Sequence, residues 1–315
     1  MAEPPFITAE QIATLVSPGE AVEAIADALR NTDPAADRPR SVIAVDAGQL
    51  LLMPSVGDAA IGVKLATVAP YNPRVGLPRI HAVYVLFDAR TLAPIATMDG
   101  AALTTLRTPA VSVAAVRPAL LARADAPRVV VFGAGPQGVG HVAALSALMD
   151  LADVTYIVRN PQGRDRMLAA GSDEALAVLR AADVVVCATT ARTPLFDSNL
   201  LTDDAIVIAV GSHEPDAREL DSALMGRAQV IVEDVATALR ECGDVALAIA
   251  EGELSADALV AMRDMVRGVA TPSTDRPIVF KCSGMAWQDL AVAARIQDAS
   301  RTRRAGLGDT TSLPG

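Results

Sequence analysis

Short apolar stretches follow one another through the first part of the chain with no helical pattern between them. They cover 41–53, 61–69, 80–88 and 93–98, and the first of them alternates and turns as a hairpin does. Strands that follow each other without intervening helices predict a mostly antiparallel sheet.

Helical spacing of apolar residues occurs on both sides of these strands. It predicts a helix over 9–30, in which Ser17-Pro-Gly-Glu20 has the residue types of an N-terminal cap. A second helix is expected over 101–122, interrupted by Pro109 and Pro118 because proline lacks the amide hydrogen that a helix interior uses.

From about residue 127 the pattern changes to continuous apolar runs separated by helical segments. Strands that alternate with helices predict an α/β fold, namely a parallel, doubly wound sheet of Rossmann type. The expected strands are 128–132, 154–158, 183–189, 205–210, 228–233 and 277–284, and the expected helices include 136–149, 234–242, 255–266 and 286–300.

The composition narrows the class of protein. A chain of 315 residues suits two domains, and a net charge of −10 without a long basic block argues against a nucleic-acid partner. No apolar run reaches the length of about 20 residues that a membrane helix needs, so no membrane partner is expected. The first residues lack the basic and apolar regions of a signal peptide, which predicts a cytoplasmic protein.

Cysteine and histidine are too sparse to predict a disulfide framework or a metal site. The cysteines are Cys187, Cys242 and Cys282, and an odd, scattered set is typical of a reducing compartment. The histidines are His81, His141 and His213, and they have no ligand-like spacing.

A glycine-rich motif follows the apolar run at 128–132 and opens the next predicted helix. The stretch Gly133-Ala-Gly135-Pro136-Gln137-Gly138 fits the G-x-G-x-x-G pattern. Alone this pattern is weak and also describes a plain glycine-rich turn. Between a strand and a helix it predicts a loop whose amides hold the pyrophosphate of a dinucleotide.

The residues after the second strand of this region bear on the choice of cofactor. NAD sites usually place an acid there to bind the ribose hydroxyls. This chain has Arg159-Asn160 instead, with Arg164 and Arg166 shortly after. An arginine pairs with a 2′-phosphate, so NADPH is expected, with NADH possible; the alternative is a solvated surface arginine.

Three basic residues suggest an anion site in the first part of the chain. Lys64 lies inside an apolar strand, Arg107 lies in LTTLRTPAVS, and Arg40 precedes the first hairpin. A lysine in so apolar a strand is costly to bury without a partner. The alternative is a lysine on the exposed face of a half-buried sheet.

The loop AVGSHEPDARELD, residues 209–221, begins where a predicted parallel strand ends. Ligands of open α/β sheets bind at that edge, which places His213 near a bound cofactor. An unperturbed imidazole titrates near pH 6.5, so His213 is a candidate proton donor; the alternative is a histidine that only lines the pocket.

These motifs together resemble the ornithine cyclodeaminase/mu-crystallin family from about residue 8 to 300. The stretches that carry the resemblance are GVKLATVAPYNPRVGLPRIHAVYVLFDARTLAPIATMDG, ALTTLRTPAVS, VVVFGAGPQG, AVGSHEPDARELD and IVFKCSGMAWQDL. The resemblance implies a homodimer of two-domain chains. An α+β substrate and dimerisation domain is expected over 1–118 with 285–315, and a Rossmann NAD(P)-binding domain over 119–284.

The resemblance also assigns expected roles to individual residues. It implies that Arg40, Lys64 and Arg107 gather around a substrate carboxylate, with Ser283 as a further substrate contact. The positions that it implies for the cofactor are His81, Arg107, Gln137, Arg159, Asn160, Thr189, Val210 and Cys282, beside the glycine loop and Arg164.

One departure from the family pattern separates the activities. Cyclodeaminases carry an acid/base aspartate where this chain has His213, and a cofactor-contacting lysine where it has Ala217. The chain is closer to the mu-crystallin and ketimine reductase branch. The expected function is therefore NADPH-dependent reduction of cyclic ketimine carboxylates of the Δ1-pyrroline-2-carboxylate or Δ1-piperideine-2-carboxylate type.

In this reading Lys64 and His213 are the catalytic candidates. Two alternatives remain open at this point: an ornithine cyclodeaminase or alanine-type dehydrogenase, and a non-catalytic, crystallin-like protein that binds a small molecule.

Overall fold

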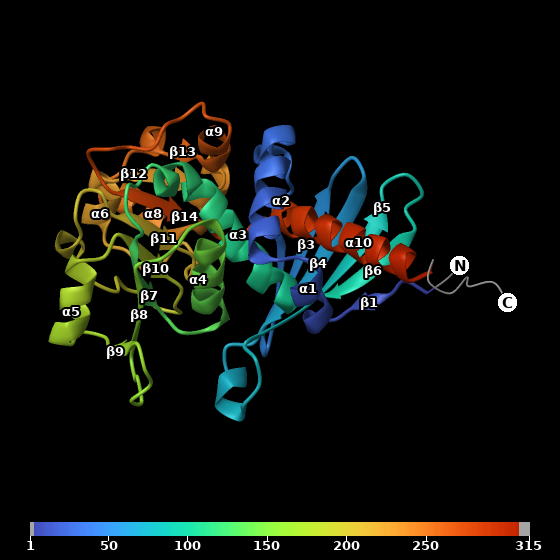
Figure 1. The fold of residues 1–315 in the computed structure, drawn as a ribbon, viewed down its shortest axis with the longest axis horizontal. Coiled ribbons are helices and arrows are strands. Elements are labelled where there is room, and N and C mark those ends of the chain that lie inside the picture. The colour runs from blue at the N-terminus through green and yellow to red at the C-terminus, as the bar shows by residue number, and fades with distance from the viewer. Residues whose placement is uncertain (1–2, 309–315) are drawn as a thin grey trace. The chain divides into compact units, whose positions relative to one another are not determined.

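A computed structural model describes residues 3–308 of the chain, which forms two compact units (Figure 1). The first unit consists of Met1–Ala28, Ala36–Arg107 and Met285–Gly315, and the second of Leu29–Ala35 and Thr108–Gly284. The expected boundary at 118/119 and the observed division after Arg107 lie in the same helix, α3 (Gly100–Leu121).

The first unit is built on a six-stranded sheet. Its strands lie in the order β1-β6-β5-β4-β3-β2, and every neighbouring pair is antiparallel except β1 with β6. The strands are β1 (Phe6–Ile7), β2 (Ser41–Val45), β3 (Gly48–Val56), β4 (Ala60–Val68), β5 (Ile80–Asp88) and β6 (Pro94–Asp99). The mostly antiparallel sheet predicted from the apolar pattern is therefore present.

Helices α1 (Ala9–Leu15) and α2 (Pro18–Asn31) replace the single helix expected over 9–30. The break has a local cause. Val16 takes an extended conformation at the end of α1, and Ser17 and Glu20 then form a reciprocal cap, with Ser17 N donating to Glu20 Oε2 over 2.9 Å.

The long C-terminal helix α10 (Ala286–Gly308) packs on β3, β4 and β5, across one face of the sheet (Figure 1). Because side chains alternate along a strand, Lys64, Ala66 and Val68 of β4 face this helix and are buried. Leu65 points to the opposite face and is exposed.

The second unit contains an eight-stranded sheet in which every neighbouring pair is parallel. Its order is β13-β12-β14-β11-β10-β7-β8-β9. The strands are β7 (Arg128–Phe132), β8 (Asp153–Val158), β9 (Met167–Ala169), β10 (Val184–Cys187), β11 (Ile206–Ala209), β12 (Gln229–Val232), β13 (Val260–Ala261) and β14 (Ile278–Lys281).

Strand order reverses at β7. The chain runs outward from it through β8 to β9 on one side and through β10 to β11 on the other, which is the doubly wound Rossmann arrangement that was predicted. The helices of this unit are α4 (Pro136–Leu148), α5 (Asp173–Arg180), α6 (Ser222–Arg227), α7 (Val235–Glu241), α8 (Gly243–Ala250) and α9 (Met262–Val266).

Two further predicted helices were wrong in detail. Helix α3 continues through Pro109 and Pro118 without interruption; most of its residues between them are buried, and this packing outweighs two missing amide donors. The segment 255–266 is a short 3-10 turn, then β13, then α9, because Val260 pairs with Ile231 of β12. None of the helices within residues 3–308 is both long and apolar enough to cross a membrane.

Candidate active site

A buried carboxylate brings two of the predicted basic residues together in the first unit. Asp289 of α10 lies 2.8 Å from Lys64 Nζ through Oδ2, and its Oδ1 accepts a hydrogen bond from Arg107 Nε over 3.1 Å. The exposed fractions are 3% for Lys64, 5% for Arg107 and 0% for Asp289. These charged groups are therefore almost completely shielded from water, and they interact with one another.

Further polar contacts fix the orientation of both basic side chains. Arg107 Nη1 donates to Gln288 Oε1 over 2.7 Å, and Lys64 Nζ donates to Thr104 Oγ1 over 3.3 Å. Arg40 is close enough for its charge to act on Lys64. The structure thus brings Lys64 and Arg107 onto one carboxylate, with Arg40 close enough to influence Lys64.

The ionisation of Lys64 reflects these surroundings. Burial lowers the pKa of Lys64 to about 8, and the charges of Arg107 and Arg40 act in the same direction, while Asp289 opposes them. The side chain is therefore still a cation at neutral pH, but one that loses its proton more readily than a surface lysine.

Two more titratable groups border the cluster. Tyr84 stands opposite Lys64 on β5, is fully buried, and its hydroxyl has no hydrogen-bond partner within the described part of the chain. Burial raises the pKa of Tyr84. Burial also raises the pKa of Asp37, whose Oδ2 accepts a hydrogen bond from Trp287 N over 2.8 Å.

His81 does not join this cluster. It pairs with Thr67 across β4 and β5, and both are exposed on the sheet face opposite to Lys64 and Tyr84.

The glycine loop of the second unit lies between β7 and the N-terminus of α4. Gly133 has φ 98°, and a Cβ there would lie 2.5 Å from the Ala188 carbonyl oxygen. A Cβ on Gly138 would lie 2.1 Å from the carbonyl oxygen of Gly133. These two glycines are required by the turn itself.

Gly135 differs from these two glycines because it leaves space open. It is the N-cap of α4, its backbone is extended with φ −81°, and a Cβ there would meet nothing within 4 Å. An open position at a helix N-terminus, where amide hydrogens point outward, fits the pyrophosphate of NAD(P). Pro136 and Gln137 form the first turn of this helix.

The end of β8 contains no acid that could bind ribose hydroxyls. Arg159 and Asn160 follow the strand and are exposed, and Arg164 is exposed in the next turn, where its Nε donates to the Pro161 carbonyl over 3.4 Å.

A buried glutamate joins two of the loops at the carboxyl edge of the parallel sheet. Glu219 Oε1 accepts hydrogen bonds from Thr189 N and Oγ1 over 2.8 and 2.7 Å, and Oε2 accepts one from Gly211 N over 2.7 Å. Thr189 comes after β10, and Val210 and Gly211 come directly after β11. Burial raises the pKa of Glu219. This carboxylate therefore positions Thr189, a predicted cofactor contact, and the backbone that follows Val210, another one.

The loop that carries His213 is bound by a second buried ion pair, which Lys281 and Asp244 form. Lys281 Nζ lies 2.9 Å from Asp244 Oδ2 and donates to the Ser212 carbonyl over 2.7 Å, and Asp244 Oδ1 accepts from the backbone amide of Glu219 over 2.8 Å. His213 itself is half-buried. The backbone directly before it is therefore fixed, and so is the end of the loop at Glu219.

Cys282 and Ser283 follow β14 at the same edge. Cys282 is buried, and Ser283 Oγ donates to Glu233 Oε1 over 2.9 Å. Glu233 also accepts from the amide of Gly284 over 2.9 Å. Ser283, predicted to contact substrate, is thus bound to an acidic side chain.

Sequence reasoning missed the acids that organise both units: Asp244, Asp289, Glu219 and Glu233. A weak signal exists for two of them. Glu233 directly follows an apolar strand, and Asp289 lies in the apolar stretch MAWQDLAVAA, where an unpaired acid would be costly.

His141 has a structural role. Burial lowers its pKa to about 4, so the ring is neutral; Nδ1 lies 2.7 Å from the Gln137 carbonyl oxygen, to which it donates, and Nε2 lies 2.9 Å from Ser112 Oγ. No group of three or more His, Cys, Asp or Glu side chains within residues 3–308 is arranged to hold a metal ion.

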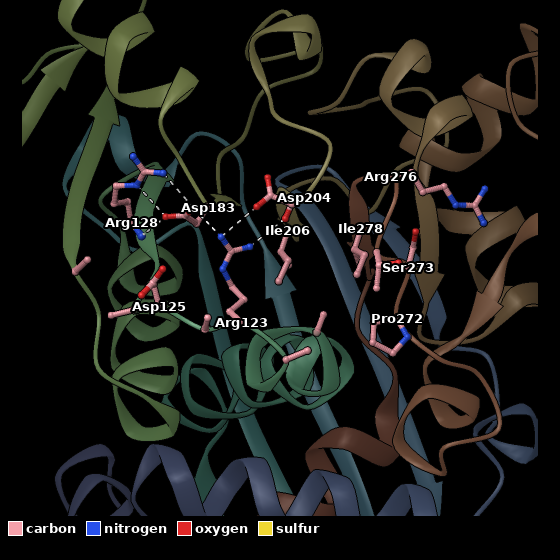
Figure 2. Close-up of a pocket in the computed structure, with 16 residues that line it drawn as sticks. Arg123, Asp125, Arg128, Asp183, Asp204, Ile206, Pro272, Ser273, Arg276 and Ile278 are labelled. Carbon is pink, nitrogen blue, oxygen red and sulfur yellow. Dashed lines mark hydrogen bonds and ion pairs between the residues drawn. The ribbon is translucent and has the colours of Figure 1, made fainter.

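A pocket of about 570 Å³ lies at the other, amino-terminal edge of the parallel sheet (Figure 2). Its polar wall is an ion network in which Asp183 accepts from Arg123 Nη2 over 2.6 Å and from Arg128 Nε over 2.9 Å. Cofactors of doubly wound sheets bind at the carboxyl edge, so this pocket is not the cofactor site. It contains none of the predicted site residues.

A doubly wound parallel sheet with this glycine loop at its carboxyl edge defines a Rossmann-type dinucleotide-binding protein. The chain belongs to the ornithine cyclodeaminase/mu-crystallin family, whose model matches residues 3–304. This confirms the family that the sequence motifs predicted.

Individual relatives cover nearly the whole chain. A Δ1-pyrroline-2-carboxylate reductase of Bacillus cereus is 32% identical over 96% of this chain and 98% of its own length. The ketimine reductase mu-crystallin of Mus musculus is 28% identical over 94% of this chain and 97% of its own. The Δ1-pyrroline-2-carboxylate reductase of Thermococcus litoralis, solved with NADH and L-proline, matches with a TM-score of 0.85 and 26% identity over 95% of this chain and 98% of its own.

The different surroundings of two glycines give a direct test of the cofactor loop. Gly135→Ala should leave the free energy of unfolding within about 0.5 kcal/mol of wild type, because the new Cβ meets no protein atom. It should weaken binding of NADPH by about tenfold or more, measured by fluorescence titration, because the Cβ occupies the space of the pyrophosphate. Gly138→Ala, the matched control, should destabilise the fold by about 1–3 kcal/mol. Unchanged NADPH affinity in Gly135→Ala would contradict this placement.

Proposed function

We propose that this protein is an NADPH-dependent reductase of cyclic ketimine carboxylates of the Δ1-pyrroline-2-carboxylate or Δ1-piperideine-2-carboxylate type. The observation that carries the proposal is the charge of the Lys64 cluster. Lys64 and Arg107 share the buried carboxylate of Asp289, so two cations face one carboxylate, and the charge of Arg40 also acts on Lys64; this arrangement suits an anionic substrate. The names of the relatives from Bacillus cereus and Mus musculus support the same reaction.

The cluster suits a substrate carboxylate. Arg40 and Arg107 hold it through charge-assisted hydrogen bonds, which fix the orientation of the ring. Lys64 completes this clamp and polarises the C=N group or relays a proton to it. Bound NADPH supplies the hydride that reduces the imine carbon.

His213 supplies or relays the proton to the imine nitrogen in this proposal. Protonation makes an iminium, which accepts hydride better than a neutral imine, and histidine titrates in the range where such transfer is efficient. The contacts of Lys281 and Glu219 with Ser212 and Gly211 support the role, because they fix the backbone next to His213.

The expected NADPH preference rests on the end of β8. Arg159 is exposed there, and no acid stands in its place to repel a 2′-phosphate. A cytoplasmic location also belongs to the proposal and is supported by the three free cysteines; cell fractionation tests it.

The homodimer is supported by an apolar face of the first unit. Ile43, Leu65 and Val83 are exposed by 47%, 38% and 42% on the sheet face that α10 does not cover. Leu50 and Leu52 lie between them on the same face. A second copy of the chain is the proposed occupant, because the family resemblance implies a dimer and a face of this kind is typical of interfaces.

The reaction is tested by mixing the purified protein with NADPH and each cyclic imine carboxylate and following NADPH absorbance. NADPH should be consumed with proline or pipecolate as product. Lys64→Met should lower kcat/KM by about a hundredfold, since it removes a charged partner of the substrate carboxylate.

His213→Asn should lower kcat more than about tenfold and leave NADPH affinity unchanged.

Three other results, two of them from assays with different substrates, would contradict the proposal. Ammonia release from ornithine without net NADPH oxidation would indicate a cyclodeaminase. Turnover of pyruvate with ammonia would indicate an alanine-type dehydrogenase, and binding without turnover would indicate a crystallin-like protein.

Arg159→Ala should raise the KM for NADPH by about tenfold to a hundredfold and leave that for NADH unchanged, because only NADPH carries the 2′-phosphate. Steady-state kinetics with both cofactors measure this. Arg180→Ala, an exposed arginine in α5 of the same unit, is the control. Equal effects on the two cofactors would count against the NADPH preference.

Leu65→Glu should convert the dimer to a monomer by placing a charge in the apolar face, as measured by size-exclusion chromatography with light scattering. Val269→Glu is the control, since Val269 is 75% exposed in the second unit and should leave the mass unchanged. A monomeric wild type, or a dimeric Leu65→Glu, would exclude this interface.

A further inference from the structure

Lysine occurs only twice in this chain, at positions 64 and 281, among 27 basic residues. Both lysines are buried, with exposed fractions of 3% and 0%, and each forms an ion pair with an aspartate. All the other basic side chains are arginines. The two lysines can therefore be compared directly, as two buried ammonium groups in one protein.

Lys281 is surrounded by more negative than positive charge. Asp244 lies 2.9 Å from its Nζ, Glu219 is also close enough for its charge to act, and Ser212 accepts its hydrogen bond. Burial alone would lower the pKa of Lys281, but these carboxylates outweigh it and raise the pKa. Lys281 is thus a fully compensated structural cation.

Lys64 has the opposite balance. Asp289 is the carboxylate that contacts it, and Arg107 shares that same carboxylate. Arg40 adds a further positive charge nearby, and the net result is a lowered pKa. Two cations, Lys64 and Arg107, thus share one carboxylate, an arrangement that suits a second anion such as a substrate carboxylate.

We propose that Asp289 is a positioning residue of the substrate site, which keeps Lys64 protonated and holds Lys64 and Arg107 in place to receive one substrate carboxylate. This inference rests on the proposed function. The inference goes beyond that function because it makes Asp289, a residue of the C-terminal helix that would not itself contact the substrate, responsible for keeping Lys64 protonated.

The groups that face Lys64 from each neighbouring element support this role. Arg107 and Thr104 of α3 contribute a cation and a neutral hydroxyl, and Tyr84 of β5 contributes a phenol whose raised pKa keeps it neutral. Arg40, before β2, adds another cation. Asp289, from α10, is the acid that pairs with the ammonium.

Asp37 is another acid near the cluster, but its charge acts on Asp289 and Tyr84, and its carboxylate accepts from Trp287 N. Without Asp289, burial and two arginines would favour the neutral amine of Lys64.

The sign of the expected effect follows from this balance. Lys64 binds a carboxylate well only when protonated, that is, at pH values below its pKa. Removing the charge of Asp289 lowers that pKa, so the loss of substrate binding begins at lower pH. At pH values below the Lys64 pKa of both the wild type and the variant, Lys64 is protonated in both proteins. Any loss of substrate binding then comes only from the lost positioning of Lys64 and Arg107.

The presence of two lysines makes a direct measurement possible. Selective ¹³C labelling of lysine gives two Cε resonances, and Lys64→Met identifies the one that belongs to Lys64. In the full-length wild type, the Lys64 resonance should titrate near pH 8 and shift to higher pH when 2-furoate, a carboxylate that does not titrate in this range, is added. In Asp289→Asn, the Lys64 titration should move down by about one pH unit or more, with Lys281 unchanged.

Kinetics supply a second readout that a structural role alone would not produce. The ratio of kcat/KM for Asp289→Asn to that of wild type should fall by about fivefold or more as pH rises toward 8, and titration of the imine substrate cancels in this ratio. Asp183→Asn, in the ion network at the other edge of the parallel sheet, is the control for stability and should give a ratio that does not vary with pH.

The proposal is overturned if the Lys64 titration is the same in wild type and Asp289→Asn, or if the kinetic ratio is low but constant with pH. If Asp289→Asn does not fold, the wild-type titration decides, because a Lys64 pKa that 2-furoate does not raise excludes the carboxylate site. Lack of imine reduction together with a 2-furoate response would reject the proposed reaction and leave the role of Asp289 intact.

Discussion

The buried carboxylate of Asp289 is the constraint on which the first unit depends. It comes from the C-terminal helix and pairs with Lys64, 225 positions earlier in the chain, and with Arg107, 182 positions earlier. Removing an ion from water costs several kcal/mol unless its partners are in place, so none of these three side chains can be buried stably without the others. The C-terminal helix therefore completes a unit that the first third of the chain begins.

The same contacts that stabilise this unit also define its chemistry. Two unit charges about 4 Å apart interact by about 4 kcal/mol at an effective dielectric constant of about 20, which is comparable to the cost of burying one of them. A difference of one neighbouring charge is then enough to decide whether the pKa of a buried lysine is raised or lowered. Lys281 and Lys64 illustrate the two results, since Lys281 has two acids beside it and Lys64 shares one acid with Arg107.

Much of the fold could be predicted because its signals are local. The strand at 80–88, the cap formed by Ser17 and Glu20, and the glycine loop before α4 each depend on residues within a few positions of one another. The basic residues of the candidate site could also be singled out in the sequence, because Lys64 lies in an apolar strand and the motif around Arg107 carries the family resemblance. Prediction was wrong where packing overrode a local signal, as at Pro109 and Pro118 in α3 and at Val260 in β13.

The contacts of the acids could not be predicted, because most of their partners are distant in sequence. Glu219 binds Thr189 and Gly211, and Glu233 binds Ser283 and Gly284, so each carboxylate fixes the backbone of loops at the carboxyl edge of the parallel sheet. A backbone amide has no side-chain signature, and nothing in the sequence marks which amide an acid will bind. The residues that chemistry singles out are basic or hydroxylic, whereas the residues that position them are buried acids. In a candidate site of this kind, the basic and hydroxylic residues can therefore be found in the sequence, whereas the contacts of the buried acids follow only from the fold.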